Sequence, residues 1–247
     1  MELWKYFAIG HANHLVCNPL SEAKLDELIE LLELRPDGRL LDIACGKAEL
    51  LVRSARRWSC SGVGVDLSPP FAADARQKIR QADLADRLEI REANGAEYDA
   101  PAASFDASSC LGASWIWGGH RGTLEALAAW VKPGGRVLIG EPFWHGEPSP
   151  AYLEASGLER SSFASHPGNV EAGTEQGLQL LHSIVSSADD WDRYEGYQWK
   201  AAEQYARANP SDPDLDELLS TMRRNRDLYL RWGRDELGWA TYLFLKP

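Results

Sequence analysis

This sequence has few cysteines and an excess of acidic over basic residues, which is not typical of disulfide-stabilised, metal-binding or nucleic-acid-binding proteins. The four cysteines, at positions 17, 45, 60 and 110, form no C-x-x-C pair and no zinc-ligand spacing. We therefore expect reduced thiols and no metal site. Lysine and arginine together number 26 against 37 aspartates and glutamates, which gives a net charge of −11. Because nucleic-acid binding requires a basic face that displaces counterions, we expect no nucleic-acid partner.

The first residues also lack a long apolar run. Met1-Glu2-Leu3-Trp4-Lys5 begins no stretch of the length that a signal peptide or a membrane span needs. We expect no membrane partner and a cytoplasmic location. A basic cluster at Arg53, Arg56 and Arg57 falls on a single predicted helix and indicates solvated surface.

Strand-like and helix-like stretches alternate along the first 145 residues. Apolar runs predict strands over 39–43, 60–65, 88–92, 105–110 and 136–140. Helical spacing of apolar residues predicts helices that begin at Ser21 and Ser68, and others over 48–57 and 121–131. Strands that alternate with helices imply a parallel sheet joined by right-handed crossovers.

The last third has a different pattern. Strands are predicted over 178–186 and 239–245, and two helical stretches lie between them, on either side of Asn209-Pro210-Ser211-Asp212-Pro213. We interpret these helices as an insertion set over the edge of the sheet. Residues 142–177 are rich in glycine, serine and proline, and we expect loops there with one short helix.

The most informative motif is the end of the first predicted strand and the loop after it. Leu41-Asp42-Ile43-Ala44-Cys45-Gly46 is followed, at the end of the second strand, by Asp66. An open α/β sheet builds a nucleoside pocket at its carboxyl edge from this order of elements: a strand, a tight loop, a helix and a second strand that ends in a carboxylate. The dinucleotide version of the loop is G-x-G-x-x-G. Only Gly46 remains of those glycines, and Asp42 would repel a pyrophosphate but suits an ammonium group.

Three further motifs follow in order. They are Ala93-Asn94-Gly95-Ala96 after the third strand, the fourth strand over 105–110, and Val131-Lys132-Pro133-Gly134-Gly135 before the fifth. Together the five motifs, over roughly 37–141, resemble those of the class I S-adenosylmethionine-dependent methyltransferases. The resemblance implies S-adenosyl-L-methionine as the cofactor.

With this resemblance the predicted fold class is α/β. We expect a Rossmann-like, mostly parallel seven-stranded sheet with helices on both faces, plus a helical insertion between the last two strands. A single domain over 1–247 would contain an N-terminal lid and helix (1–36), a cofactor-binding core (37–145) and the insertion (188–235), a candidate substrate cap.

The resemblance also implies a set of cofactor-binding residues. They are Asp42, Ala44, Cys45, Gly46, Asp66, Leu67, Asn94, Gly95, Ala96 and Cys110. Asp66 would accept hydrogen bonds from both ribose hydroxyls, and Asp42 would serve the amino group of the methionine tail. Gly46 would let the backbone approach that tail, Cys110 would offer its carbonyl near it, and 94–96 would face the adenine. Alanines at 44 and 48 replace glycines that are common in the family, which makes the loop stiffer.

The acceptor pocket is expected between the ends of the fourth and fifth strands. Segments 111–117 and 141–145 should line it, and the stretch 6–14 and the insertion can close it. The candidate substrate residues are Tyr6, His14, Trp115, Glu141, Trp144 and Tyr194. If Trp115, Trp144 and Tyr194 converge, they suit a planar or cationic acceptor or an electron-rich sulfur. No general base is assigned from the sequence.

The predicted function is methyl transfer to a small-molecule acceptor. The N/D-P-P-Y/F run that often follows the fourth strand in methyltransferases of nucleobase amines is missing, in agreement with the acidic charge. Two alternatives stay open at this point. One is a non-catalytic module that binds S-adenosylmethionine, and the other is a nicotinamide-dependent oxidoreductase.

Overall fold

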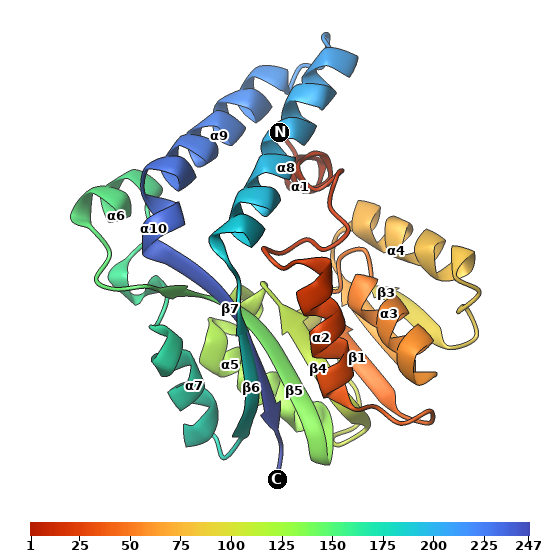
Figure 1. Ribbon diagram of the computed structural model, residues 1–247. Helices are drawn as coiled ribbons and strands as arrows, with labels where there is room; N and C mark the ends of the chain where they lie inside the picture. The colour runs from red at the N-terminus through yellow and green to blue at the C-terminus, as the bar shows by residue number, and fades with distance from the viewer.

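The computed structural model describes residues 1–247 and contains one seven-stranded sheet (Figure 1). The strand order is β3-β2-β1-β4-β5-β7-β6. Strand β7 alone runs against its neighbours, because it pairs antiparallel with both β5 and β6. The strands are β1 (Arg39–Ile43), β2 (Ser61–Asp66), β3 (Leu88–Glu92), β4 (Phe105–Leu111), β5 (Val131–Trp144), β6 (Gln179–Val185) and β7 (Leu237–Leu245). The predicted mostly parallel seven-stranded sheet is confirmed.

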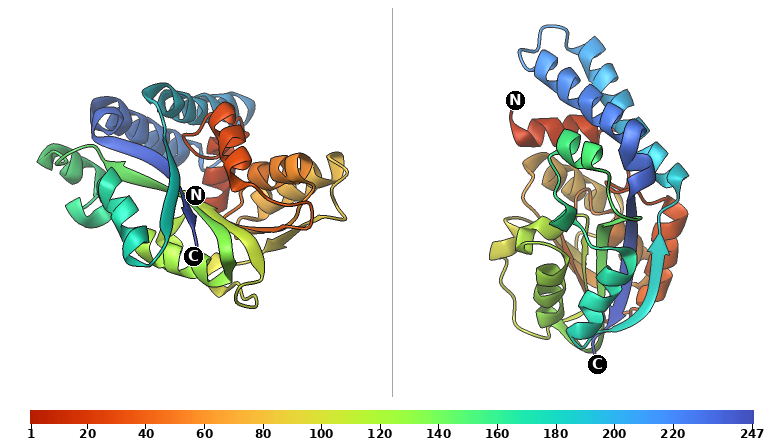
Figure 2. Two further views of the ribbon diagram at one scale, coloured as in Figure 1. Left: turned by 60° about the horizontal axis from the view of Figure 1, so that its bottom comes forward. Right: turned by 90° about the vertical axis from the view of Figure 1, so that its left-hand side faces the viewer.

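Helices cover both faces of this sheet. The main ones are α1 (Leu3–Gly10), α2 (Glu22–Leu32), α3 (Glu49–Trp58), α4 (Pro69–Gln81), α5 (His120–Trp130), α6 (Pro150–Ser156), α7 (His166–Glu175), α8 (Ala188–Ala208), α9 (Leu215–Leu228) and α10 (Arg234–Glu236). The buried side chains of α2, α3 and α4 belong to one core cluster and those of α5 to another. The right-hand view of Figure 2 shows α2 and α5 on opposite faces of the strands.

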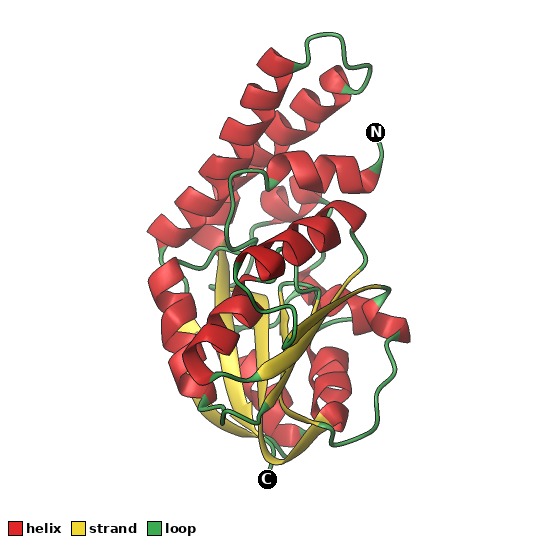
Figure 3. Cartoon of the chain, turned by 90° about the vertical axis from the view of Figure 1, so that its right-hand side faces the viewer, coloured by secondary structure: helices red, strands yellow, loops and turns green.

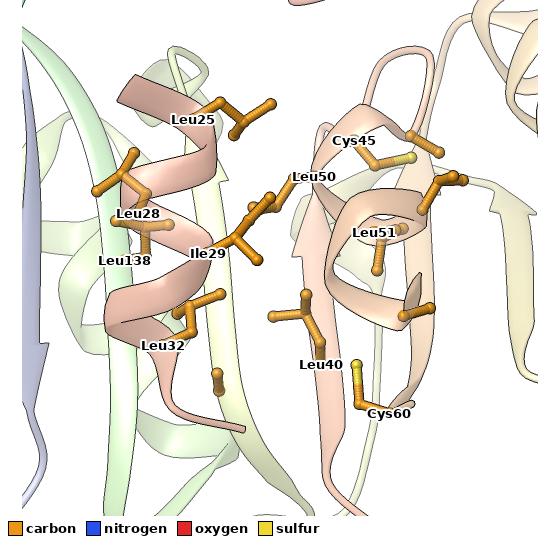
Figure 4. Close-up of a cluster of buried hydrophobic side chains, with 14 of the residues drawn as sticks. Leu25, Leu28, Ile29, Leu32, Leu40, Cys45, Leu50, Leu51, Cys60 and Leu138 are labelled. Carbon is orange, nitrogen blue, oxygen red and sulfur yellow. The ribbon is translucent and has the colours of Figure 1, made fainter. Parts of the chain in front are cut away.

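Helix α2 illustrates why the sequence folds locally as it does. The Ser21 hydroxyl accepts a hydrogen bond from the Lys24 backbone N–H at 3.3 Å and so caps the first turn. The apolar side chains that follow recur on one face and are almost fully buried: Leu25, Leu28, Ile29 and Leu32. Figure 4 shows this row beside Leu138 of β5 and Leu40 of β1.

The segment 142–177 differs from its prediction. Instead of loops with one short helix, it contains the end of β5, then α6, a 3₁₀ turn (Arg160–Ser162) and α7. Ser149 caps the Tyr152 N–H ahead of Pro150, and Ser165 caps the Gly168 N–H at the start of α7. The serines and prolines that suggested loops are therefore helix starts.

Strand β5 is also longer than predicted, since it runs from Val131 to Trp144 rather than over 136–140. Gly134, with φ +80°, makes a bend within this longer strand. Its N–H still donates to the Lys246 carbonyl at 2.7 Å, so the backbone stays hydrogen-bonded through the turn. At the other end, pairing with β7 continues through Trp144, opposite Leu237.

Helices α8 and α9 lie between β6 and β7 in the chain and extend past the carboxyl ends of the parallel strands (Figures 1 and 3). Helix α1 lies against them. The Lys5 ammonium donates to Asp212 at 2.8 Å and to Asp214 at 2.6 Å, which ties the N-terminal helix to the α8–α9 connection. None of the helices combines the length and the apolar character needed to cross a bilayer.

The packing of α2 leads to a stability prediction. Leu28→Ala removes a side chain that is 1% exposed, and it should lower the free energy of unfolding by about 2–5 kcal/mol, because a cavity replaces close contacts. Leu3→Ala, at a position 57% exposed, should change it by less than about 0.5 kcal/mol. Urea denaturation measures both, and equal losses would contradict this account of the core.

Candidate active site

A cavity lies over the carboxyl ends of β1, β2 and β4, below the N-terminal segment and α8. Seventeen of its 28 lining residues are hydrophobic. The predicted cofactor residues that line it are Asp42, Ala44, Cys45, Gly46, Asp66, Leu67, Asn94 and Gly95. Ala96 and Cys110 do not line it: Cys110 is fully buried within β4, while Leu111 and Gly112 after it reach the wall.

The loop between β1 and α3 has three residues in the left-handed conformation. They are Ala44 (φ 55°), Gly46 (φ 53°) and Ala48 (φ 58°). For the two alanines this conformation costs roughly 1–2 kcal/mol each, a strain that typically collects at functional sites. A Cβ on Gly46 would meet Cys17 Sγ at 3.9 Å, an ordinary van der Waals distance, so the backbone there is not crowded by its neighbours. Ala44 and Ala48, which replace glycines common in the family, thus adopt the left-handed backbone conformation that glycine favours.

Asp66 joins this loop to the one after β2. One carboxylate oxygen accepts the Gly46 N–H at 2.7 Å, and the other accepts the Ser68 N–H at 2.8 Å. Burial raises the pKa of Asp66, and these two N–H donors oppose the rise. Because a carboxylate offers about four lone-pair positions, Asp66 keeps acceptor capacity for two further donors.

Asp42 is a second buried carboxyl group on the cavity wall. Its Oδ1 accepts a hydrogen bond from the Ser109 hydroxyl at 2.7 Å. Burial raises the pKa of Asp42 to about 7, with a smaller contribution in the same direction from the Asp66 charge. Near neutral pH this group is therefore partly protonated, and a neighbouring cation would favour its ionised form.

Asn94 uses its side chain locally. Its carbonyl oxygen accepts the Ala96 N–H at 3.0 Å, and its amide donates to Glu97 at 3.1 Å, so it caps the short turn Gly95–Glu97. The backbone at Gly95 lines the cavity. Any contact with a ligand at this position therefore comes mainly from the backbone.

Two of the three aromatic candidates, Trp115 and Tyr194, come together in this cavity, and Trp144 does not join them. Trp115, which is 71% exposed, and Tyr194 both line the cavity. Trp144 is buried elsewhere, with its indole N–H donating to the Arg160 carbonyl at 3.0 Å and its ring against Tyr152 and Phe163. The cause is the extension of β5, which carries Trp144 beyond the cavity to the side of α6.

Three other candidate substrate residues lie outside this cavity. Tyr6 packs on α9, where its hydroxyl accepts from the Asn225 amide at 3.1 Å. Glu141 is buried, accepts from the Ser114 hydroxyl at 2.9 Å, and has its pKa raised to about 7 by burial. His14 donates from Nε2 to the Tyr194 carbonyl at 2.9 Å and lines a second cavity between the N-terminal segment and α8.

The sequence did not single out His11, which pairs with Tyr194 on the cavity wall. His11 Nδ1 lies 3.0 Å from the Phe7 carbonyl, which can only accept, so this nitrogen carries the proton. Nε2 then accepts from the Tyr194 hydroxyl at 3.1 Å. Burial lowers the pKa of His11 to about 4, so the imidazole is neutral at physiological pH.

Lys47 is also missing from the sequence-based candidates. It is the single lysine or arginine on the cavity wall. Its ammonium donates to the carbonyls of His11, at 2.7 Å, and His14, at 3.1 Å. The feature of the sequence that could have indicated Lys47 is its place directly after Gly46 in the cofactor loop.

These features define a class of protein: an α/β protein that binds a nucleoside cofactor at the carboxyl edge of its sheet. Residues 40–135 match the family model described as "Methyltransferase domain". The chain is 31% identical to YjhP of Escherichia coli (strain K12) over 247 residues, 99% of each protein. It is 30% identical, with a TM-score of 0.92, to a SAM-dependent methyltransferase from Geobacter sulfurreducens solved with S-adenosyl-L-homocysteine, over 98% of both chains. It is also 30% identical to 27-O-demethylrifamycin SV methyltransferase of Amycolatopsis mediterranei, over 73% of this chain and 66% of that protein.

The chain belongs to the class I S-adenosylmethionine-dependent methyltransferase family. It is a methyltransferase, and its cofactor is S-adenosylmethionine. The cavity fits that cofactor, because it combines open backbone at Gly46, a carboxylate with free acceptor capacity at Asp66, and apolar walls. The nicotinamide alternative is set aside.

The position of Asp42 makes a pH prediction. The pKa of Asp42 is about 7 in the folded protein and about 3.9 in an unfolded chain. The protonated carboxyl group therefore contributes fully to stability below about pH 3.9, and this contribution is lost as the pH rises through about 7. Asp42→Asn should therefore raise the melting temperature relative to the wild type at pH 8 and change it little at pH 4. The exposed Asp37→Asn is the control. A shift of Asp42→Asn that does not depend on pH would contradict the raised pKa.

Proposed function

We propose that this enzyme methylates a small-molecule acceptor with an apolar surface. The observation that carries the proposal is the mouth of the cavity. Leu15 (50% exposed), Leu67 (46%) and Trp115 (71%) are exposed apolar side chains, and all three line it. Exposed apolar residues around a concave, mostly hydrophobic site are typical of small-molecule binding.

The charge of the protein supports a small acceptor over a nucleic acid. The chain has 37 acidic residues against 26 basic ones, and the cavity wall carries a single basic side chain, Lys47. Phosphate backbones bind where several lysines and arginines gather. The relative from Amycolatopsis mediterranei is likewise named for a small-molecule acceptor, a demethylrifamycin.

The cofactor contacts that we propose follow from the hydrogen bonds already present. The Asp66 carboxylate is held by the N–H groups of Gly46 and Ser68, and its remaining lone pairs accept hydrogen bonds from the two ribose hydroxyls. The backbone at Gly46 meets the methionine tail, and Asp42 faces its ammonium group. The backbone at Gly95 faces the adenine, since the Asn94 side chain is already used in capping.

The cofactor supplies an electrophilic methyl group on a sulfonium, so the residues of the chain mainly orient the acceptor and exclude water. Orientation of two reactants can lower a barrier by about 7–11 kcal/mol. A hydroxyl or amine acceptor must also lose a proton. We propose that its proton passes to the Tyr194 oxygen while the Tyr194 proton passes to His11 Nε2 along the existing 3.1 Å hydrogen bond, and that His11, whose pKa is about 4, then releases the proton to water.

An acceptor screen tests the proposed function. The protein is incubated with S-adenosylmethionine and, separately, with phenols, thiols, amines, carboxylic acids, transfer RNA and an unfolded protein, and formation of S-adenosylhomocysteine is measured. We expect turnover with at least one small apolar acceptor and none with the two macromolecules. Turnover with a macromolecule alone would refute the small-molecule assignment.

The proposed ribose contact makes a binding prediction. Asp66→Ala removes two charge-assisted hydrogen bonds to the ribose, each worth about 1.5–3 kcal/mol, and should weaken S-adenosylhomocysteine binding by about 100-fold or more. Calorimetry measures the loss. Asp66→Asn, which keeps the size of the side chain, should also bind weakly, and the exposed Asp74→Ala on α4 should bind normally. Wild-type affinity in Asp66→Asn would rule out the charged contact.

A further inference from the structure

The Lys47 ammonium has unused capacity on the wall of the cofactor cavity. An ammonium group has three donors. Two of them are directed to the carbonyls of His11 and His14, and Lys47 forms no ion pair with any carboxylate within 4.0 Å. The nearby Glu49 is already paired with Arg53, at 2.7 Å, and with Lys78. Lys47 is therefore a half-buried cation without a charged partner.

The charges around the cavity are otherwise negative. Asp42, Asp66 and the ion-paired Glu49 lie on the wall, and Lys47 is the one lysine or arginine there. The methionine tail of the cofactor carries an ammonium and a carboxylate. The ammonium is attracted by the two aspartates, and they repel the carboxylate. A carboxylate in this cavity has one cationic side chain to meet.

The position of Lys47 in the chain agrees with this pairing. It directly follows Gly46, whose backbone is open to the cavity and has φ +53°. A tail that lies against Gly46 therefore has its carboxylate within reach of the next side chain. We propose that the third donor of Lys47 binds the α-carboxylate of the cofactor and makes the enzyme selective for ligands that carry this group.

The same contact links the cofactor to the N-terminal segment. Lys47 holds the backbone at the end of α1 through the carbonyls of His11 and His14. His11 is in turn the hydrogen-bond partner of Tyr194 on α8. One ammonium group thus positions the bound tail, the N-terminal segment and, through His11, the acceptor side of the cavity.

Two ligands that differ in the carboxylate test this role by calorimetry. S-adenosylhomocysteine has both charged groups of the tail, and its decarboxylated analogue keeps only the ammonium. In Lys47→Gln, S-adenosylhomocysteine should bind about 10- to 100-fold more weakly, as loss of one charge-assisted hydrogen bond predicts. The decarboxylated analogue should bind Lys47→Gln within about threefold of its affinity for the wild type, or more tightly. The substitution removes the repulsion between the Lys47 ammonium and the ammonium of the analogue.

Two control variants keep the test interpretable. Lys47→Arg retains the charge and should keep most of the preference for the carboxylate-bearing ligand, even if Lys47→Gln folds poorly. Lys200→Met, at an exposed lysine of α8, should leave both affinities unchanged. An equal loss for the two ligands in Lys47→Gln would overturn the proposal and leave Lys47 only the role of holding the N-terminal segment.

This inference rests on the cofactor, and it does not depend on the acceptor. The binding comparison needs no methyl transfer, so a failed acceptor screen would leave it intact. Conversely, methylation of a small molecule by the wild type, together with an equal loss of affinity for both ligands in Lys47→Gln, would support the proposed function and refute the proposed role of Lys47.

Discussion

The structure of the site depends on one carboxylate that bridges two loops. Asp66, at the end of β2, accepts the backbone N–H of Gly46 after β1 and that of Ser68 at the start of α4. These bonds hold the loop over 44–48 in a conformation in which two alanines adopt positive φ. The local strain is therefore offset by hydrogen bonds to a buried charge.

The cap over the cavity comes from the two ends of the chain. Helix α1 and the helices between β6 and β7 meet above the sheet, and ion pairs from Lys5 to the α8–α9 connection hold them together. Tyr194 and His11, which are 183 residues apart in the chain, become hydrogen-bond partners through this contact. The part of the cavity wall formed by the N-terminal segment and α8 is thus built by tertiary packing, whereas the part below it is built by consecutive strand ends.

That difference explains how much could be predicted from the sequence. The bounds of β1 and β3 agree with their predictions, and most of the predicted cofactor residues line the cavity, because strand, loop and carboxylate follow one another locally. Trp144 could not be placed correctly, since its position depends on how far β5 continues beside β7. Lys47 and His11 were missed because their roles arise from contacts between the loop after β1 and the N-terminal segment.

A crystal structure of the protein with S-adenosylhomocysteine tests the central claim most directly. The account predicts both ribose hydroxyls within hydrogen-bond distance of the Asp66 carboxylate, with the bond from the Gly46 N–H to that carboxylate still present. A nucleoside bound away from Asp66, for example in the second cavity beside α8, would contradict it.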